Sequence, residues 1–423
     1  MNARYFMPAI FAVAVGCAPA TPTGPTYYKD IKPLVEQHCA NCHSQGGIAP
    51  FTLENYLSAL DHKMEIRKAL SEKTMPPWQP GAGCTDYQGD FSLDDATIKT
   101  FTDWVDTGAN AGNEADYKPT ATLVPAGLTR IDRSVQLSVP YTPVRSPDDY
   151  HCFLMDWPEA ATSYVTGFRA TPGDKRIVHH VIAFLAPPAQ VAAYQALDDA
   201  EAGPGYTCFG GPGNGGSLAQ WLGAWAPGTA GGDFPAGTGI EVEAGSKIIL
   251  QVHYNTSVQP PVPDQTSIDF KIDSTVEKKA ILQPWTNPSW INQKTMTIPA
   301  GMPNVMHNWI VDPMLPLAYV TKGLVAVDQS FTMHTSGLHM HTRGTSARLD
   351  ILRADGTKEC LLDLPRWDFH WQGGYAFTNA KTFNPGDMLS LECHWDNSKG
   401  TTDVNWGEGT GDEMCLGSFY ITH

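Results

Sequence analysis

The stretch "GLHMHTRG" at residues 337–344 places His339 and His341 one residue apart. If the segment is a β-strand, both side chains point to the same face, because successive side chains alternate. Two imidazoles on one face can bind one metal ion, and imidazole is a ligand for zinc, copper, nickel and iron. Met414 in "GDEMC" is a candidate third ligand, and its soft thioether favours Cu(I). Considered alone, Met414 would be interpreted as a packing residue.

A second set of histidines comes from two other strand-like runs. "RIVHHVIAFL" contains His179 and His180, and "LQVHYN" contains His253. Adjacent residues on a regular strand face opposite sides, so His179 and His180 can share one ion only at a strand end or a β-bulge. Each of the three histidines alone would be interpreted as an ordinary surface or core residue.

The chain also contains Cys39, Cys42 and His43 in the pattern C-x-x-C-H, the attachment signature of c-type haem. The two thiols can add to the haem vinyl groups, and the imidazole can bind the iron. A dithiol redox motif and half of a zinc site are the alternatives, but neither requires the histidine. Met75 in "TMPPWQP" is the expected sixth iron ligand, because two prolines follow it and hold the loop rigid. Met64, within a predicted helix, is the fallback.

Residues 26–113 are predicted to form the small helical domain that carries this motif. Ile31, Leu34, Val35 and His38 follow the i, i+3, i+4, i+7 spacing of a helix that ends in the cysteine motif. In "SLDDATIKTFTDWVDTGAN", a second helix is expected, with Ser92 and Asp95 as a capping box and Gly108 as its end. Its predicted buried face consists of Ile98, Phe101, Trp104 and Val105. The region resembles the small class I cytochrome c domains.

From about residue 125 the sequence pattern changes to short strand-like runs separated by Gly/Pro turns. The chain has 423 residues, of which 39 are Gly and 33 are Pro. Such runs are typical of a β-sandwich or jelly roll, and no crossover helices are present that would indicate a parallel sheet. We therefore predict a mainly β protein with one small all-α domain.

Charge and the N-terminus indicate where the protein acts. The formal net charge of −16 argues against nucleic acid and anionic membrane surfaces as partners. "MNARYFMPAIFAVAVGC" has Arg4, an apolar run over residues 6–15 and then Cys17, which is typical of an export signal. "AVGC" resembles a bacterial lipobox, although Ala14 stands where that pattern prefers Leu. We expect an exported bacterial protein, anchored through lipid on Cys17 at the periplasmic side or the cell surface.

Four short pieces of the β region occur in the order and at the separations of one known family. "HHVIAFL", "LQVHYN", "HMHTRG" and "GDEMC" resemble the copper type II, ascorbate-dependent monooxygenases, which include peptidylglycine α-hydroxylating monooxygenase and dopamine β-hydroxylase. The resemblance covers about residues 125–423. It implies two antiparallel jelly-roll domains that each bind one copper ion. It also implies that one copper, held by His179, His180 and His253, stores an electron. The other copper, held by His339, His341 and Met414, would activate O2 and cleave the substrate C–H bond.

The predicted organisation follows from these observations. We expect a signal peptide, lipobox and tether at 1–25, a cytochrome c domain at 26–113, and a linker at 114–124. The first copper domain is expected at 125–270 and the second at 271–423. The cofactors are then two copper ions and one covalently bound haem c.

The nine cysteines fit this organisation, with one expected to carry lipid and two to bind haem. The family resemblance implies disulfides between Cys393 and Cys415 and between Cys152 and Cys208. Cys84 and Cys360 remain, and the sequence leaves open whether they pair across domains or stay free thiols.

Two features differ from the animal enzymes. The positions that bind the substrate carboxylate in the peptide-amidating enzyme correspond here to Gly337, Leu416 and Ser418, which argues against a C-terminal glycine peptide as substrate. Arg343 lies close to the motif, and we assign it no role. The second difference is the haem domain, whose tether would raise the local donor concentration to about the millimolar range. We therefore hypothesise that the haem replaces ascorbate as the electron donor to the first copper.

The sequence thus predicts an oxidoreductase that hydroxylates a C–H bond of a small molecule or peptide with O2, with an external electron donor to the haem. A non-catalytic haem–copper protein for electron transfer or copper handling is the alternative, and a surface-displayed binding protein ranks third. "WDFHWQGGY", at residues 367–375, could line a pocket or simply pack in a strand. Gln251 would share a strand face with His253 and could support that site.

Overall fold

The computed structural model describes residues 24–423 except 41, 46–48, 121–126, 210, 214–218, 227–228, 230, 258–259 and 322. The predicted signal peptide and the lipobox residue Cys17 lie outside the described residues. In the described part of the chain, no helix is both long enough and apolar enough to cross a membrane.

The chain divides into two compact units. The helical unit comprises Met1–Pro76 and Leu93–Leu123, and the β unit comprises Pro77–Ser92 and Val124–His423. Residues 77–92 therefore pack with the β unit, although they lie within the range predicted for the helical domain. The predicted domain boundaries otherwise stay a prediction.

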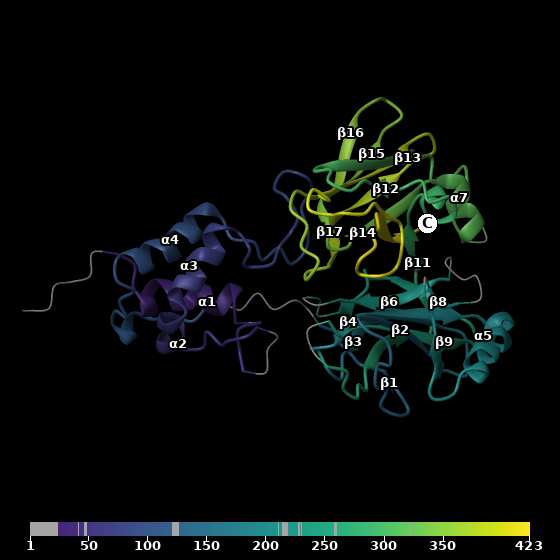
Figure 1. Cartoon of the computed structure of the whole chain (residues 1–423), viewed down its shortest axis with the longest axis horizontal. Helices are drawn as coiled ribbons and strands as arrows, with labels where there is room; N and C mark the ends of the chain where they lie inside the picture. Colours follow the sequence, from purple (N-terminus) through teal and green to yellow (C-terminus); the bar gives the residue numbers. More distant parts are fainter. Residues whose placement is uncertain are drawn as a thin grey trace, which may run out of the picture. The chain divides into compact units, whose positions relative to one another are not determined.

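Figure 1 shows the short helices of the helical unit, which pack around one small core. Tyr27, Ile31, Val35, Phe101 and Trp104 are buried in this core. The elements are η1 (Tyr27–Ile31), α1 (Lys32–His38), α2 (Tyr56–Asp61), α3 (Lys63–Ser71), α4 (Asp95–Asp106) and η2 (Glu114–Asp116). The predicted first helix thus ends at His38, immediately before the cysteine motif.

Helix α4 begins differently from the prediction. Its N-cap is Asp94, whose carboxylate accepts a hydrogen bond from the amide of Thr97 over 2.7 Å. The predicted capping box of Ser92 and Asp95 is wrong, because the Ser92 amide donates instead to Asp90 in the preceding turn. A carboxylate at this position also interacts favourably with the positive end of the helix dipole. The end of the helix agrees with expectation, since Gly108 follows it with a φ of +102°.

The β unit contains two regions of strands. The first region comprises β1 (Arg133–Gln136), β2 (Asp148–Asp156), β3 (Ser163–Thr171), β4 (Val178–Ala186), α5 (Pro188–Ala200), β5 (Tyr206–Thr207), β6 (Trp221–Trp225), β7 (Gly232–Asp233), β8 (Thr238–Val242), β9 (Lys247–Asn255) and β10 (Ser267–Asp273). The second region comprises β11 (Lys278–Trp285), α6 (Pro288–Asn292), β12 (Thr297–Ile298), β13 (Val305–Val311), α7 (Met314–Val320), β14 (Phe331–His339), β15 (Gly344–Leu352), β16 (Lys358–Leu364), β17 (Gly374–Phe383), β18 (Met388–Trp395), β19 (Val404–Asn405) and β20 (Leu416–Thr422). The prediction of a mainly β protein is confirmed.

Strand β11 joins the two regions into one sheet. It pairs with β8 and β6 of the first region and along its length with β20, which in turn pairs with β14. With β11 inserted among the strands of the first region, the order is β1-β10-β3-β8-β11-β6-β4-β9-β2-β5. The second region also contains a sheet of order β13-β18-β15-β16 and a small sheet of β12 and β19. Figure 1 shows the two regions meeting at β11. The jelly-roll topology of each region stays a prediction.

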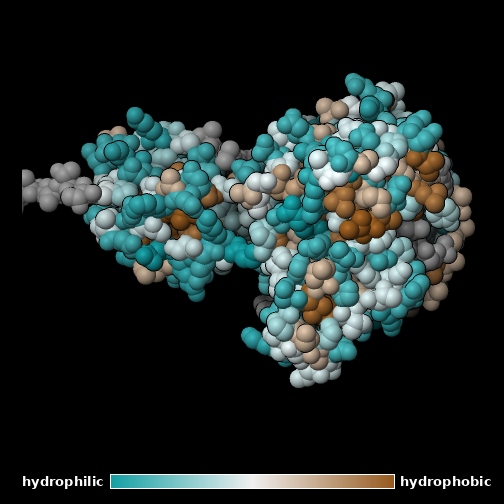
Figure 2. Space-filling model, turned by 90° about the horizontal axis from the view of Figure 1, so that it is seen from above, coloured by the Kyte–Doolittle hydropathy of each residue, from teal (hydrophilic) through white to brown (hydrophobic). Residues whose placement is uncertain are grey.

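Each region has a hydrophobic core of its own. Val165, Val181 and Leu250 are fully buried in the first core, and Leu349, Leu391 and Trp395 are fully buried in the second. The outer surface is mixed, and hydrophobic areas lie among polar ones on the larger body in Figure 2. Exposed apolar side chains include Leu315 and Tyr319 on α7.

Three disulfides stabilise the β unit: Cys84–Cys360, Cys152–Cys208 and Cys393–Cys415. The last two are the pairs that the family resemblance implies. The first resolves the alternative left open by the sequence, because Cys84 and Cys360 are paired. This disulfide fastens the segment 77–92, which we call the strap, to β16. Tyr87 of the strap is buried and its hydroxyl donates to the carbonyl of Leu361 over 2.9 Å.

Candidate metal centres

The three histidines of the first set come together because β4 is irregular at its start. The register between β4 and β9 shifts between Val178 and His180, which is the β-bulge that two adjacent histidines need in order to face one point. His180 lies opposite His253 in this ladder. The candidate ligand atoms of His179, His180 and His253 all lie within 4.8 Å of one another.

The same ring nitrogen of each histidine faces the centre of this set. Nδ1 of His180 lies 3.4 Å from Nδ1 of His179 and 3.4 Å from Nδ1 of His253. Nitrogen ligands bind a small transition-metal ion at about 2.0 Å, which separates neighbouring ligand nitrogens by about 3.3–3.5 Å. The observed spacing therefore fits three nitrogens arranged around one ion.

Asp148 on β2 determines which nitrogen of His253 is free. Its Oδ1 accepts a hydrogen bond from Nε2 of His253 over 2.9 Å, so the proton is on Nε2 and the Nδ1 lone pair faces the centre. The ring of Tyr150 stacks on the His253 ring with centroids 3.9 Å apart. Burial favours the protonated carboxyl of Asp148, but hydrogen bonds from His253 and Thr410 outweigh burial and lower its pKa.

The electrostatic environment keeps the imidazoles neutral. Burial, followed by the neighbouring imidazoles, lowers the pKa of His179 to about 2 and that of His180 well below its usual value. Burial also lowers the pKa of His253, partly offset by Asp148. Neutral imidazoles keep the lone pairs that metal binding requires.

His339 and His341 lie at the end of β14, which finishes at His339. Their ring centroids are 5.1 Å apart, and the intervening Met340 is fully buried in the core. Nδ1 of His339 donates to Oε1 of Gln372 over 2.6 Å, and Nδ1 of His341 donates to the carbonyl of Asp412 over 3.1 Å. Both Nε2 atoms are therefore the ones available to an ion. Burial lowers the pKa of His339 to about 3 and that of His341 to about 4.

Met414 is buried two residues before β20 begins. Leu416 pairs with His339 in the β14–β20 ladder, so Met414 is two residues from the position opposite His339. The preceding carboxylate of Glu413 accepts hydrogen bonds from the amides of His341 and Arg343, over 2.9 and 2.5 Å, and from the Trp395 indole over 2.9 Å. The following residue, Cys415, is in the disulfide with Cys393. The backbone on both sides of Met414 is thereby fixed next to His341.

The two histidine sets lie next to each other. The ring centroids of His180 and His339 are 6.4 Å apart. Phe369 contacts both sets, stacking on His179 at 4.5 Å and lying edge-on to His341 at 6.1 Å. The two regions of the β unit therefore bring five candidate histidine ligands to one location, with the backbone of Met414 beside His341.

The C-x-x-C-H motif lies in the helical unit, directly after α1. Cys39 and Cys42 are outside the disulfides, and Nδ1 of His43 donates to the carbonyl of Phe51 over 3.0 Å, which leaves Nε2 for an iron ion. Burial raises the pKa of Cys39 to about 12, the opposite of the lowered pKa that a dithiol redox motif uses. Met75 is half-buried, whereas the fallback Met64 is 61% exposed.

Two other residues named from the sequence contact the loops around the centres and not the candidate ligands. Gln251 does not support His253 as expected; in the described structure its amide donates to the carbonyl of Gly211 over 3.0 Å. Arg343 holds the loop before Met414 by donating to the carbonyl of Gly411 over 2.8 Å.

Three residues that contact the candidate ligands were not predicted from the sequence: Asp148, Phe369 and Gln372. Phe369 and Gln372 belong to the aromatic segment 367–375 that was considered as a pocket lining, so the sequence carried a weak signal for them. Asp148 had no such signal, because it precedes His253 by more than a hundred residues.

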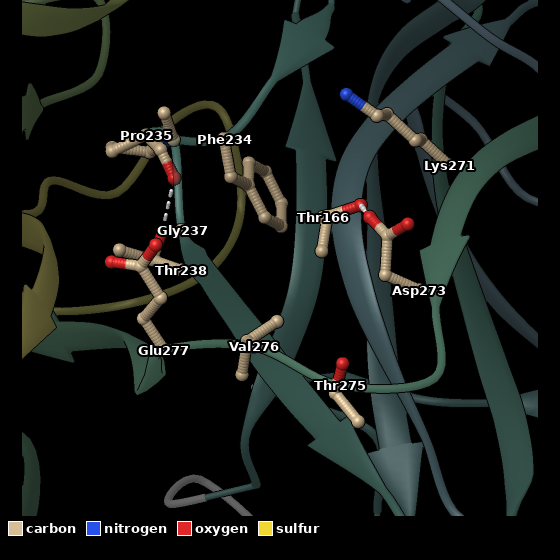
Figure 3. Close-up of a pocket in the computed structure, with 11 residues that line it drawn as sticks. Thr166, Phe234, Pro235, Gly237, Thr238, Lys271, Asp273, Thr275, Val276 and Glu277 are labelled. Atoms are coloured by element: carbon tan, nitrogen blue, oxygen red, sulfur yellow. Dashed lines mark hydrogen bonds between the residues drawn. The ribbon is translucent and has the colours of Figure 1, made fainter.

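A separate hollow on the first region does not resemble a reaction site. It is lined by Thr166, Phe234, Lys271 and Asp273 among others, and Figure 3 shows Thr166 and Asp273 side by side. Two of its charged groups are paired, since Lys271 contacts Asp233 and Asp273 contacts Arg130. None of the candidate metal ligands lines it.

Comparison with known proteins supports a relationship to copper monooxygenases. Residues 321–423 match the family described as copper type II ascorbate-dependent monooxygenase, C-terminal domain. The chain is 23% identical to tyramine beta-hydroxylase of Caenorhabditis briggsae over 322 residues, which cover 70% of this chain and 50% of that protein. It is 26% identical to DBH-like monooxygenase protein 1 of Homo sapiens over 202 residues, 46% of this chain and 31% of that protein. The chain thus spans half or less of the length of these relatives.

Among solved structures, the chain is similar to PNGase F, a glycosylasparaginase from Flavobacterium meningosepticum. The sequence identity is 12%, with 69% of this chain and 96% of that chain covered and a TM-score of 0.28. A likeness at this level has no bearing on function.

Proposed function

We propose that this chain is a copper-dependent monooxygenase that hydroxylates a C–H bond of an organic substrate with O2. The observation that carries the proposal is the meeting of two neutral histidine sets, His179/His180/His253 and His339/His341, with ring centroids as close as 6.4 Å. The first set directs ring nitrogens toward a common point, and in the second set both Nε2 atoms are left without the hydrogen bonds that the Nδ1 atoms make. The match of residues 321–423 to the copper monooxygenases supports copper as the ion.

The chain's own residues hold the ions in different chemical settings. Nδ1 atoms of His179, His180 and His253 form an all-nitrogen site, with Asp148 fixing the tautomer of His253. Nε2 atoms of His339 and His341, together with the thioether of Met414, form a softer site suited to Cu(I). When bound, the copper ions supply electron storage at the first site and O2 activation at the second.

We propose that the substrate binds beside His339, where the neighbouring positions on β14 and β20 carry uncharged residues. Gly337 pairs with Ser418, and His339 pairs with Leu416, in the β14–β20 ladder. A Cβ atom on Gly337 would lie 2.7 Å from Oγ of Ser418, so this wall has no room for a larger side chain at residue 337. The described residues Gly337, Leu416 and Ser418 are all uncharged, which favours a neutral substrate group over a carboxylate.

A c-type haem bound by Cys39, Cys42, His43 and Met75 is proposed as the electron donor. The proposal is supported by the occurrence of the C-x-x-C-H motif and the candidate copper ligands in one chain, since a covalent connection raises the local donor concentration to about the millimolar range. The haem, when bound, supplies single electrons.

The remaining expectations stay part of the proposal. The protein is proposed to be exported and lipid-anchored through Cys17, and to receive electrons from an external donor to the haem. The alternative is a non-catalytic haem–copper protein, which the missing carboxylate anchor at residues 337, 416 and 418 keeps in consideration.

The test is to measure copper and haem in the purified full chain, with matched variants. We expect two copper ions and one haem per chain, and one copper after His179→Ala or His339→Ala. His334→Ala is the control, because His334 lies on β14 but hydrogen-bonds Thr422 instead. Oxygen uptake that needs both a reductant and an organic substrate would distinguish the enzyme from the non-catalytic alternative. A wild-type chain that binds no copper would refute the proposal.

A further inference from the structure

The loop that leads to Met414 is held by strands of the other β region. Residues 406–413 form most of the 406–415 connection between β19 and β20, and Thr410 donates to Asp148 twice, from its hydroxyl over 2.6 Å and from its amide over 3.1 Å. The Tyr150 hydroxyl donates to the carbonyl of Glu408 over 2.7 Å. Asn255 donates to both Asp148, over 3.1 Å, and the Thr410 hydroxyl, over 3.4 Å. We call these contacts between β2, β9 and the loop the clasp.

One end of the clasp is part of the first histidine set. Asp148 accepts from Nε2 of His253 with the same Oδ1 atom that accepts from Thr410. Tyr150 also contacts His253. The centroids of the two rings are 3.9 Å apart, and the rings are nearly parallel. Neither Asp148 nor Tyr150 can shift without moving the His253 ring or the loop.

The other end of the clasp is part of the second set. Two residues after Thr410, the carbonyl of Asp412 accepts from Nδ1 of His341 over 3.1 Å. Glu413 accepts from the amide of His341, and Met414 follows. A continuous series of contacts therefore runs from His253 through Asp148 and Thr410 to His341 and Met414.

We propose that Asp148 and Thr410 are positioning residues that hold the Met414 loop against the first β region and so fix the two histidine sets relative to each other. The inference rests on the proposed function, since it assigns the two sets to two metal ions. Each set is built by its own region with its own core, and β11 is the strand ladder that joins the regions. The clasp adds direct hydrogen bonds at the centres themselves.

The chemistry of the clasp suits this purpose. Asp148 is a largely buried acceptor, 11% exposed, that serves a ring N–H, a backbone N–H and a hydroxyl together, so a break in one contact leaves a polar group at this position with fewer partners. The loop between β19 and β20 contains no strand of its own beyond a bridge from Trp406 to Glu413, and the clasp adds to the contacts that Arg343 and Glu413 make nearer its end. Loss of the clasp is expected to loosen the part of the loop around Thr410 while both cores stay folded.

The test uses variants that break the clasp without altering a histidine. Thr410→Val removes the hydroxyl, and Tyr150→Phe removes the bond to Glu408 but keeps the ring that stacks on His253. Thr410→Ser retains the hydroxyl and serves as the rescue variant. Thr166→Val is the matched control, because the Thr166 hydroxyl donates to Asp273 over 2.6 Å in the same region but away from the loop.

The first measurement is amide hydrogen exchange of residues 406–413 in the full chain without copper. We expect exchange to rise by about tenfold or more in the Thr410→Val/Tyr150→Phe double variant. Thr166→Val and Thr410→Ser should exchange like the wild type. Unchanged exchange in the double variant would overturn the proposal.

The second measurement is X-ray absorption of the Cu(I)-loaded chain. The sulfur contribution from the thioether is expected to fall by about half or more in the double variant while bound copper stays at the wild-type count. A merely structural role would leave this signature unchanged at equal copper content, and that result would also overturn the proposal. If the wild type binds no copper, the proposed function fails, whereas the exchange measurement on the metal-free chain still decides whether the clasp orders the loop.

Discussion

Gln372 connects His339 to the aromatic ring that lies between the two histidine sets. Its side-chain oxygen accepts from Nδ1 of His339 over 2.6 Å, while its amide donates to the carbonyl of Phe369 over 2.9 Å. The first contact fixes the tautomer of His339, and the second fixes the backbone that carries Phe369. One side chain thus orients a proposed metal ligand and the ring that stacks on His179.

Replacing Gln372 with Leu should weaken copper binding at the second histidine set. Without the acceptor, Nδ1–H of His339 is left without its partner, and the ring is free to rotate or to change tautomer. Losses of such supporting partners reduce metal affinity by about 10–100-fold. A Cu(I) competition titration would measure the change, and the first histidine set should keep its affinity.

Gln88→Leu is the matched control for this prediction. The Gln88 amide donates to the carbonyl of Phe377 over 2.9 Å, a contact of the same type on the strap. Copper affinity in Gln88→Leu should equal that of the wild type. Equal affinities in Gln372→Leu and Gln88→Leu would show that Gln372 does not support the metal site.

Met75→His should lower the reduction potential of the haem. A thioether ligand stabilises reduced iron relative to an imidazole ligand, so His/Met ligation gives the higher potential. Redox titration of the full chain, followed in the haem absorption bands, would measure the difference. Met64→His provides the control, because Met64 is 61% exposed. A shift in the control and none in Met75→His would reverse the ligand assignment.

Removing the Cys84–Cys360 disulfide should destabilise the strap. The pair joins residues 276 apart in sequence, and the loss of such a bond typically reduces the free energy of unfolding by about 2–4 kcal/mol. Denaturant unfolding of Cys84→Ser/Cys360→Ser would measure this effect. Tyr87→Phe gives the comparison, since it removes one buried hydrogen bond to Leu361 and should reduce stability by about 1 kcal/mol. Proteolysis within the strap should be faster in Cys84→Ser/Cys360→Ser, which loses more unfolding free energy than Tyr87→Phe. A Cys84→Ser/Cys360→Ser variant as stable as the wild type would contradict the role of the disulfide.

Local spacing predicted the parts of the centres that lie close together in the sequence. His339 and His341 are one residue apart at a strand end, and the requirement for a bulge at His179 and His180 follows from the alternation of strand side chains. The burial of Phe101, Trp104 and Val105 on α4 likewise follows from helical periodicity. In each case neighbours in sequence determine the result.

The supporting contacts could not be predicted because tertiary folding creates them. Asp148 meets Thr410 across 262 residues, and Gln372 meets His339 across 33. Neither side chain is distinguishable in sequence from the many Asp and Gln residues on loops and strand edges. The N-cap of α4 was predicted at the wrong residue for a local reason. Three acidic or hydroxyl residues, Ser92, Asp94 and Asp95, stand near the start of the helix, and any of them can serve as its N-cap.

His151 should make the stability of the β unit depend on pH. Its ring stacks on Tyr141 at 4.1 Å, and Nε2 donates to the carbonyl of Pro204 over 2.8 Å, whereas Nδ1 is buried without a hydrogen-bond partner. Burial lowers its pKa, partly offset by the Pro204 carbonyl, because protonation would place an N–H at Nδ1 with no acceptor.

The unfolded chain binds the proton with an ordinary pKa of about 6.5. The stabilisation is therefore complete above that value and is lost as pH falls toward the lowered folded-state pKa. The difference in unfolding free energy between the wild type and His151→Gln should shrink between about pH 7 and pH 5, measured by urea unfolding at each pH. Parallel profiles over this range would show that the His151 ring can be protonated in the folded protein without a penalty.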